Sequence, residues 1–383
     1  MKKLLYITNI PAPYRQKRFN KLAEIFPKFG LDLEVLYMAK IEPNRKWHIS
    51  KDSYNYKYKI FWGIHPTVGN MFAHFNPGLL LRLLKKDYHY AVVGGMSSPT
   101  HWLSALFVRS RITIMSVESN MNSVKRTTGL SYRLKKFLLG GVDAYQVTGN
   151  PQIEYINFFA NGSSSYKPFI KLPNLIDDSV FVDLVEQIKL SKREQLRAEY
   201  CVENSTQMWV LPARLIRIKG ILPFLKLLKG KTGYKLFILG EGELKNEIEQ
   251  FILTHELNVI LAGFVQQDDI VNYYAAADLF ILPSLEDPSP LSPIEASAAK
   301  LPLLVSDRIG NKEDLIIEGL NGWSFDIEAQ VKFNIKIIDD ILKLNNPELK
   351  KMGLRSYENF NVKFDVEACL ISYVENIKAI DEN

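Results

Sequence analysis

Residues 278–296 read DLFILPSLEDPSPLSPIEA, and this stretch decides the fold. Its first five residues form a short apolar run between turn formers, which predicts a buried strand of a parallel sheet. Its end predicts a helix start, with Ser292 as N-cap, Pro293 as first helical residue and Glu295 as the acid of a capping box. The loop between them follows the carboxyl end of a strand and precedes a helix, and open α/β sheets bind ligands in that place.

The polar residues of this loop differ in how well a structural role explains them. Two interpretations of Glu295 stay open, a helix-capping acid or a ligand contact. Ser289 and Ser292 are commonly turn and cap residues. Asp287 precedes a proline-rich turn and has no evident structural duty, so it is a functional candidate.

The size of the chain bounds its organisation. Its 383 residues are enough for two domains, each with its own core. With 47% hydrophobic and 23% charged residues, the composition is ordinary for a soluble globular protein, and no apolar run is long enough for a spanning helix. The first residues, MKKLLYI, become polar too soon for a signal peptide and predict a strand.

The charge and the cysteine content limit which kinds of partner and which cell compartment suit the protein. The net charge of +6 suits a phosphate-bearing ligand or an anionic membrane surface, and it is too weak and scattered to indicate nucleic acid. Without an export signal, Cys201 and Cys369 are expected to be free thiols in a reducing cytosol.

The 278–296 stretch resembles the donor-binding motif of retaining glycosyltransferases of the GT-B fold, family 4. That motif is Glu, seven residues and Glu, and Asp287 and Glu295 stand in its two acidic places. The resemblance implies that the first acid contacts the transferred sugar and the second bonds the ribose. The usual aromatic–glycine pair is replaced by Ser-Pro, and Pro290 has no N–H, so the amides of Leu291 and Ser292 remain to face the diphosphate.

Other segments of the second half resemble the same family in order. Arg214 and Lys219 match an Arg and a Lys that grip the diphosphate in the family. Negative charge builds on the oxygens of the leaving diphosphate, and fixed cations aimed at them lower the barrier to transfer. The alternative interpretation is that Arg214 and Lys219 are two surface cations without this role. Gly240 and Glu241 match a Gly-acid-Gly element, and Phe264 lies in a segment that is beside the nucleobase in relatives.

The first half resembles the family only in architecture. Arg15 follows the first strand in a turn without Gly-x-Gly-x-x-Gly, and since GT-B enzymes often admit the acceptor near this turn, the resemblance implies that Arg15 faces it. Gly95 follows a later strand, where small residues let a ligand approach the backbone, and it is expected to contact the acceptor. Many family members have a histidine near the sugar at the end of a later strand, and Glu118 stands in that place here, so the resemblance implies that it bonds the donor sugar or the acceptor hydroxyl. A surface arginine and an ordinary loop glutamate are the alternatives. The basic Lys125 to Lys136 segment is expected to lie on an anionic membrane or to form a solvated helix face.

The sequence therefore predicts an α/β protein of the GT-B fold, with two Rossmann-like doubly wound domains facing across a cleft. Residues 1–175, joined by a helix at about 365–383, are expected to bind the acceptor. Residues 176–364 are expected to bind the nucleotide sugar. The tail, from Val366 to Ile380, is expected to be helical and to cross back to the first domain, as GT-B chains do.

The resemblance implies a retaining glycosyltransferase that moves a sugar from a UDP- or GDP-sugar to a carbohydrate or lipid-linked saccharide, in cell-surface polysaccharide or lipopolysaccharide synthesis. Its catalytic candidates are Asp287, Glu118, Arg214 and Lys219. No Asp-x-Asp occurs in the sequence, so neither a cofactor nor a metal is expected, with Arg and Lys in the place of the cation.

Two other functions stay open, a sugar-nucleotide epimerase or hydrolase on the same fold and a non-catalytic two-lobed binding protein. The nucleotide, the sugar, the acceptor and the mechanism of retention are open as well. The expected location is the cytoplasm, with a peripheral position at the inner face of the plasma membrane as a second expectation.

Overall fold

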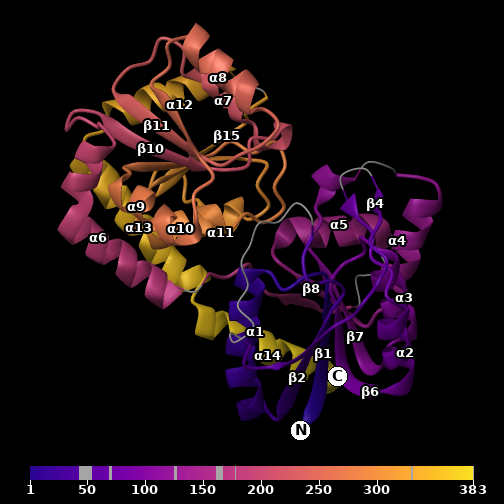
Figure 1. Ribbon diagram of the computed structural model, residues 1–383. Coiled ribbons are helices and arrows are strands. Elements are labelled where there is room, and N and C mark those ends of the chain that lie inside the picture. The colour runs from indigo at the N-terminus through magenta and orange to yellow at the C-terminus, as the bar shows by residue number, and fades with distance from the viewer. Residues whose placement is uncertain are drawn as a thin grey trace. The chain divides into compact units, whose positions relative to one another are not determined.

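A computed structural model describes most of the chain. The described residues are 1–42, 54–68, 71–124, 127–160, 167–176, 178–328 and 331–382. They form two compact units, which Figure 1 shows in ribbon form. Unit 1 comprises Met1–Leu175 and Val366–Asn383, and unit 2 comprises Ile176–Asp365.

Unit 1 is built on a parallel sheet in the order β3-β2-β1-β6-β7-β8-β9. Its strands are β1 Lys2–Thr8, β2 Leu31–Tyr37, β3 Lys57–Ile60, β6 Asp87–Val93, β7 Arg109–Val117, β8 Ala144–Val147 and β9 Phe169–Lys171. The central strands are apolar runs with almost fully buried side chains, because helices cover both faces of the sheet. The strand order reverses between β1 and β6, so the topological switch point of unit 1 lies there.

The helices of unit 1 start where the sequence allows a helix to begin. They are α1 Pro13–Ile25, α2 Pro77–Lys85, α3 Pro99–Phe107, α4 Leu130–Gly140, α5 Asn150–Ala160 and α14 Val366–Glu382. The first three begin at a proline, whose fixed φ suits the first helical turn and whose missing N–H costs nothing there. Short connecting elements are η1 Phe26–Phe29, η3 Met121–Ser123 and the antiparallel pair β4 Thr67–Val68 and β5 Met71–Phe72.

The last helix, α14, is tied to the sheet of unit 1 at its middle and near its end. Near its middle, the buried Tyr373 hydroxyl donates to Gln146 Oε1 of β8 at 2.7 Å. Near its end, Asp381 accepts a hydrogen bond from His89 Nε2 at 2.7 Å and forms ion pairs with Arg111, at 2.9 Å, and with Lys2. The final segment of the chain therefore completes the core that the first residues begin.

Unit 2 is built on a second parallel sheet, in the order β12-β11-β10-β13-β14-β15. Its strands are β10 Gln207–Pro212, β11 Tyr234–Leu239, β12 Val259–Gly263, β13 Leu279–Leu282, β14 Leu303–Ser306 and β15 Gly322–Phe325. Its helices are α6 Asp178–Glu199, η5 Arg217–Lys219, α7 Ile221–Leu227, α8 Lys245–Thr254, α9 Gln267–Ala276, α10 Ser292–Ala298, α11 Lys312–Leu315, α12 Val331–Lys343 and α13 Asn346–Lys363. The strand order reverses between β10 and β13, which is the switch point of this sheet.

The strand predicted at 278–282 is β13, and all four of its side chains are buried. The predicted cap of the helix that follows is wrong. The N-cap of α10 is Leu291, in a right-handed helical conformation, and its side chain makes no capping hydrogen bond. The Leu291 carbonyl already accepts the Ile294 N–H at 2.9 Å and the Glu295 N–H at 3.0 Å, so Ser292 lies inside the first turn.

Candidate functional site

An ion pair marks the switch point of unit 2. Lys219 Nζ pairs with Asp287 Oδ2, and the two residues lie in the loops that follow the central strands β10 and β13. The Lys219 side chain is 15% exposed and the Asp287 side chain 16%, so both charges are largely withdrawn from water and interact more strongly than surface charges do. The pair lies where open α/β sheets bind their ligands.

The turn that carries Lys219 lies directly against the loop after β13. Gly220 adopts a left-handed conformation with φ +65°, and a Cβ on it would lie 2.0 Å from the Pro283 carbonyl oxygen. The backbone N–H of Leu285 donates to the Ile218 carbonyl at 2.8 Å. A glycine is required at this position for both its φ and the close approach, and it brings Lys219 within reach of the acid.

The loop after β14 supports the acid from the other side. Gly310 N–H donates to the Asp287 carbonyl at 2.8 Å, and a Cβ on Gly310 would lie 1.9 Å from the Pro288 carbonyl oxygen. Buried Asn311 donates through Nδ2 to the Pro290 carbonyl at 2.9 Å. Pro288 and Pro290 have no N–H, so the loop has few backbone donors of its own. Hydrogen bonds from Gly310 and Asn311 to its carbonyl groups hold it in place instead.

The second acid of the motif has a partner from another helix. The hydroxyl of Tyr274, in α9, donates to Glu295 Oε2 at 3.1 Å. Tyr274 is fully buried, and burial together with the neighbouring Glu295 carboxylate raises its pKa well above the usual value. Tyr274 therefore keeps its proton and fixes one oxygen of Glu295, which is only partly buried in the first turn of α10.

The other candidates of unit 2 also lie at the carboxyl edge of the sheet. Arg214 is exposed after β10, and the adjacent Leu215 N–H donates to the Glu241 carbonyl at 2.9 Å. A Cβ on Gly240 would lie 2.1 Å from the Ala213 carbonyl oxygen, so the loops after β10 and β11 are in direct contact. These close approaches explain the glycine at 240 and place Glu241 beside the Arg214 loop.

Three further candidates differ in their distance from the ion pair along the sheet. Phe264 is 45% exposed and follows β12, which is separated from β13 by two strands. Leu291 and Ser292 are partly buried at the start of α10, in the same loop as Asp287. The structure thus brings Lys219 and Asp287 into contact and arranges the rest along the same edge.

Unit 1 has its own ion pair at the carboxyl edge. Arg15, in α1, donates through Nη1 to Thr8 Oγ1 at 2.8 Å and through Nη2 to Glu118 Oε1 at 3.1 Å. The Arg15 side chain is 16% exposed and that of Glu118, directly after β7, is 51% exposed. Gly95 follows β6 with φ +112°, at the same edge. Arg15 is therefore a fixed cation that joins two strand ends.

Sequence reasoning missed several buried polar residues at this edge of unit 1. Asn120 and Thr148 follow β7 and β8, and His101 lies in α3. Each has one buried polar atom without a hydrogen-bond partner among the described residues, namely Asn120 Oδ1, Thr148 Oγ1 and His101 Nε2. Burial, with nearby His74 and Arg15, lowers the pKa of His101 to about 3, so its ring is neutral. Buried polar atoms are normally paired, so three such atoms at one edge of the sheet are unusual.

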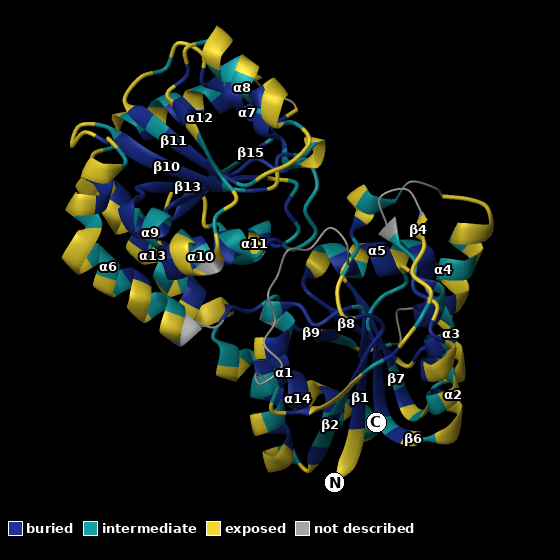
Figure 2. Cartoon of the chain, viewed as in Figure 1, coloured by how far each residue is buried: buried dark blue, intermediate teal, exposed yellow. Residues whose placement is uncertain are grey.

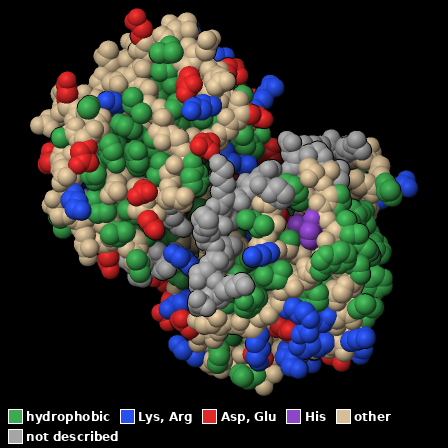
Figure 3. Space-filling model, viewed as in Figure 1, with side chains coloured by type: hydrophobic (Ala, Val, Ile, Leu, Met, Phe, Trp, Pro, Cys, Tyr) green, Lys and Arg blue, Asp and Glu red, His purple; other side chains and the backbone are tan. Residues whose placement is uncertain are grey.

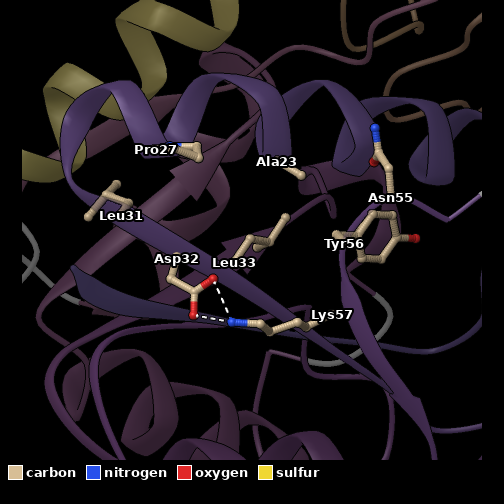
Figure 4. A pocket seen from close by; sticks show the side chains of 8 residues that line it. All are labelled: Ala23, Pro27, Leu31, Asp32, Leu33, Asn55, Tyr56 and Lys57. Carbon is tan, nitrogen blue, oxygen red and sulfur yellow. Dashed lines mark hydrogen bonds and ion pairs between the residues drawn. The ribbon is translucent and has the colours of Figure 1, made fainter.

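The cavity in Figure 4 is separate from these sites. It lies at the amino ends of β2 and β3, where the Asp32 carboxylate pairs with Lys57 Nζ at 2.8 Å beside Asn55 and Tyr56. Ligands of open sheets bind at the carboxyl ends of strands, so this cavity is not part of the candidate site. Across the ranges that the structure describes, no cluster of three or more His, Cys, Asp or Glu is arranged to hold a metal ion.

The chain is also similar to known proteins. Residues 192–358 match the family model of glycosyl transferases group 1. Over 189 residues the chain is 29% identical to an uncharacterized glycosyltransferase of Methanocaldococcus jannaschii, covering 47% of this chain and 45% of that protein. Over 146 residues it is 29% identical to the Escherichia coli UDP-Gal:alpha-D-GlcNAc-diphosphoundecaprenol alpha-1,3-galactosyltransferase, covering 37% and 36%. The match thus spans less than half of each relative, and the family match and these names support a transferase enzyme.

A solved structure extends the similarity to both units. The Anabaena protein HepE, in complex with UDP-glucose, superimposes with a TM-score of 0.70 over 99% of this chain and all of that protein, at 15% sequence identity. Identity this low shows the fold alone. The predicted α/β architecture of GT-B type, with two Rossmann-like sheets, is confirmed. Of the predicted basic segment, Lys125 and Arg126 lie outside the described residues.

Proposed function

We propose that this protein is a retaining glycosyltransferase of family 4, which transfers a sugar from a UDP- or GDP-sugar to a carbohydrate or lipid-linked saccharide. The observation that carries the proposal is the largely buried Lys219–Asp287 ion pair at the switch point of unit 2. A cation and an acid fixed together at that point suit a ligand that has both an anionic and a hydroxyl-rich part. A nucleoside diphosphate sugar is such a ligand.

The leaving diphosphate is the part that needs cations. Arg214 and Lys219 both follow β10, and we assign them to the oxygens on which charge builds as the glycosidic bond to phosphate breaks. Preorganised charges stabilise that change without waiting for solvent to reorganise. In this proposal no metal is required and no cofactor takes part, because the two side chains supply the positive charge.

The acids orient the rest of the donor. Asp287 accepts hydrogen bonds from hydroxyls of the transferred sugar, while Glu295 accepts from the ribose. The Tyr274 hydroxyl occupies one Glu295 oxygen, so the carboxylate is presented in one orientation. Gly240, Glu241 and the amides of Leu291 and Ser292 line the same donor site, and Phe264 lies beside the base.

We assign the acceptor to the carboxyl edge of unit 1. Arg15 and Glu118 form a fixed pair there, Gly95 leaves room for close approach, and the buried atoms of Asn120 and Thr148 offer hydrogen-bond capacity to hydroxyl groups. The E. coli relative is named for a diphosphoundecaprenol-linked acceptor, which supports a lipid-linked saccharide. A role in cell-surface polysaccharide or lipopolysaccharide synthesis, at the inner face of the plasma membrane, fits such an acceptor.

The first experiment is a thermal-shift screen of UDP- and GDP-sugars. A donor at 100 times its Kd stabilises the folded protein by about 2.7 kcal/mol, which gives a readable rise of the midpoint. The stabilising donor is then incubated with and without saccharide acceptors. Transfer requires an acceptor, an epimerase or hydrolase turns over without one, and a binding protein shows affinity without chemistry. Stabilisation by no nucleotide sugar contradicts the proposal.

A further inference from the structure

Two histidines of unit 1 face each other through the same ring nitrogen. His74 Nδ1 lies 2.9 Å from His65 Nδ1, and the ring centroids are 4.9 Å apart. His74 is buried and His65 is exposed, and Figure 3 shows histidine atoms at the surface of unit 1. Nitrogens at this distance share a hydrogen bond in which one ring donates and the other accepts.

The backbone explains why these two rings meet. Ile64, just beyond β3, and Phe75, just before α2, pair in antiparallel fashion, and each N–H donates to the other carbonyl at 2.9 Å. Side chains alternate between the two sides of such a ladder, and residues directly opposite each other share a side. The register therefore places His65 opposite His74, on the side away from Ile64 and Phe75.

A carboxylate extends the histidine pair to a chain of three groups. His74 Nε2 lies 3.3 Å from Glu42 Oε1, and the Glu42 side chain is 15% exposed. An ionised carboxylate only accepts, so His74 Nε2 carries the proton of this hydrogen bond. In the neutral His74 ring Nδ1 is then the acceptor, and His65 Nδ1 donates to it. The remaining lone pair of the chain is on His65 Nε2, at its exposed end.

The Glu42–His74–His65 chain lies at the switch point of unit 1. The loop of Glu42 follows β2 and lies against the end of β1, where the Asn9 carbonyl accepts the Ala39 N–H at 2.9 Å. The His74 carbonyl accepts the N–H of Thr100 at 3.0 Å and its hydroxyl at 2.9 Å, in the first turn of α3, just after β6. The chain is thus held by the ends of β1 and β6, where open sheets bind their ligands.

We propose that His65 is the general base that takes the proton of the acceptor hydroxyl, with His74 and Glu42 as positioning residues. The hydroxyl oxygen forms the new bond to the anomeric carbon with a lone pair, while its O–H bond breaks and the proton moves to His65 Nε2. The electrons of the broken sugar–phosphate bond leave with the diphosphate. The positive charge on His65 is stabilised through His74 by the Glu42 carboxylate.

The inference rests on the proposed function, because it requires an acceptor hydroxyl bound at unit 1. Glu118 is the other candidate for this proton, but both of its oxygens already accept from Arg15 Nη2, at 3.1 and 3.3 Å. The inference holds for any saccharide acceptor, whether or not it is linked to a lipid. Among the described helices none is long and apolar enough to cross a membrane.

Replacing His65 by Ala tests the base directly. Loss of a general base is expected to lower kcat by about 10²- to 10⁴-fold, while thermal stabilisation by the donor stays unchanged. Added imidazole should restore part of the activity, because it supplies the missing proton acceptor. The matched control is His255→Ala, which removes a histidine that packs on Phe251 at the end of α8 in unit 2, and its kcat should be unchanged.

The pH profile separates a base from a merely structural side chain. Burial and the neighbouring His74 lower the pKa of His65, so kcat/KM should fall in acid only below the ordinary histidine value of about 6.5. Glu42, Arg15 and His101 are the other ionisable groups around this place, and burial lowers the pKa of His101 to about 3. Glu42→Gln removes the charge that stabilises the imidazolium and should move the acid limb to lower pH. His65→Ala should abolish that limb.

Several results overturn the proposal. One is a folded His65→Ala protein with near-normal kcat, or with the acid limb unchanged. Another is a nitrogen-15 NMR spectrum that places the proton of neutral His65 on Nε2. Loss of activity with a chelator, restored by Zn²⁺, would show that the two facing nitrogens hold a metal instead. Transfer that persists in His65→Ala leaves the proposed function standing, whereas stabilisation by no nucleotide sugar contradicts the proposed function itself.

Discussion

Replacing Lys219 by Ala tests the centre of the proposed donor site. The Lys219 and Asp287 side chains are 15% and 16% exposed, between the limits of a surface pair and a buried pair. Surface pairs contribute up to about 1 kcal/mol, and breaking a buried pair costs about 3–5 kcal/mol, so Lys219→Ala is expected to lower the free energy of unfolding by about 1–3 kcal/mol. The variant should remain folded.

The expected effect on turnover is larger than the effect on stability. Loss of one preorganised group that stabilises transition-state charge lowers kcat by about 10²–10³-fold. Release of nucleoside diphosphate at saturating donor and acceptor measures it. The matched control is Arg217→Ala, which removes an exposed cation from the same short 3-10 turn and is expected to change kcat less than about threefold.

The control also defines what refutes the reasoning. A folded Lys219→Ala protein with near-normal kcat removes Lys219 from the mechanism. An equal fall in kcat for Arg217→Ala and Lys219→Ala would show that turnover depends on the positive charge of this turn in general and not on the contact between Lys219 and Asp287.

Three further predictions follow from contacts of the described residues. Gly310→Ala is expected to displace the loop that carries Asp287, because the new Cβ would lie 1.9 Å from the Pro288 carbonyl oxygen. A displacement of about 1 Å lowers kcat/KM by about 10²-fold, and the circular dichroism spectrum should stay that of the folded α/β protein. Glu295→Gln should raise the donor Kd, and Tyr274→Phe should raise it less, as titration calorimetry measures; unchanged Kd values would return Glu295 to a helix-capping role. For Asp381, the hydrogen bond from Lys2, with His89 and Arg111 nearby, lowers the pKa to about 2, so its stabilisation is present above about pH 4 and is lost as the pH falls toward 2. Asp381→Asn should therefore lower the thermal midpoint at pH 7, by an amount that shrinks in acid; a difference independent of pH would contradict this.

The sequence predicts elements better than contacts. The apolar run of β13 and the proline-rich loop after it are local patterns, and each indicates its structure without knowledge of the rest. The ion pair of Lys219 and Asp287 depends on strand order, which brings the ends of β10 and β13 together although several elements separate them in the chain. No local sequence pattern indicates that β10 and β13 are neighbours in the sheet.

Other parts of the site lack a sequence signal for a related reason. Tyr274 lies in α9 with the buried pattern of an ordinary core aromatic, and only the tertiary structure shows that its hydroxyl reaches Glu295. Asn311 resembles a turn residue until its bond to the Pro290 carbonyl is seen. The predicted cap at Ser292 is wrong because the Leu291 carbonyl starts the helical hydrogen bonds one residue earlier than the Ser-Pro pattern indicates.

The return of α14 to unit 1 has a consequence for synthesis and for exchange of parts. Because Val366–Asn383 are translated after Ile176–Asp365, unit 1 has all of its strands but lacks its last helix, α14, until the whole of unit 2 has been made. Unit 2 is thus one continuous segment, Ile176–Asp365, that the chain enters from unit 1 and leaves to unit 1. Under the proposed function, replacing Ile176–Asp365 by the corresponding segment of a relative is expected to change which nucleotide sugar is bound, while both chain ends stay the same.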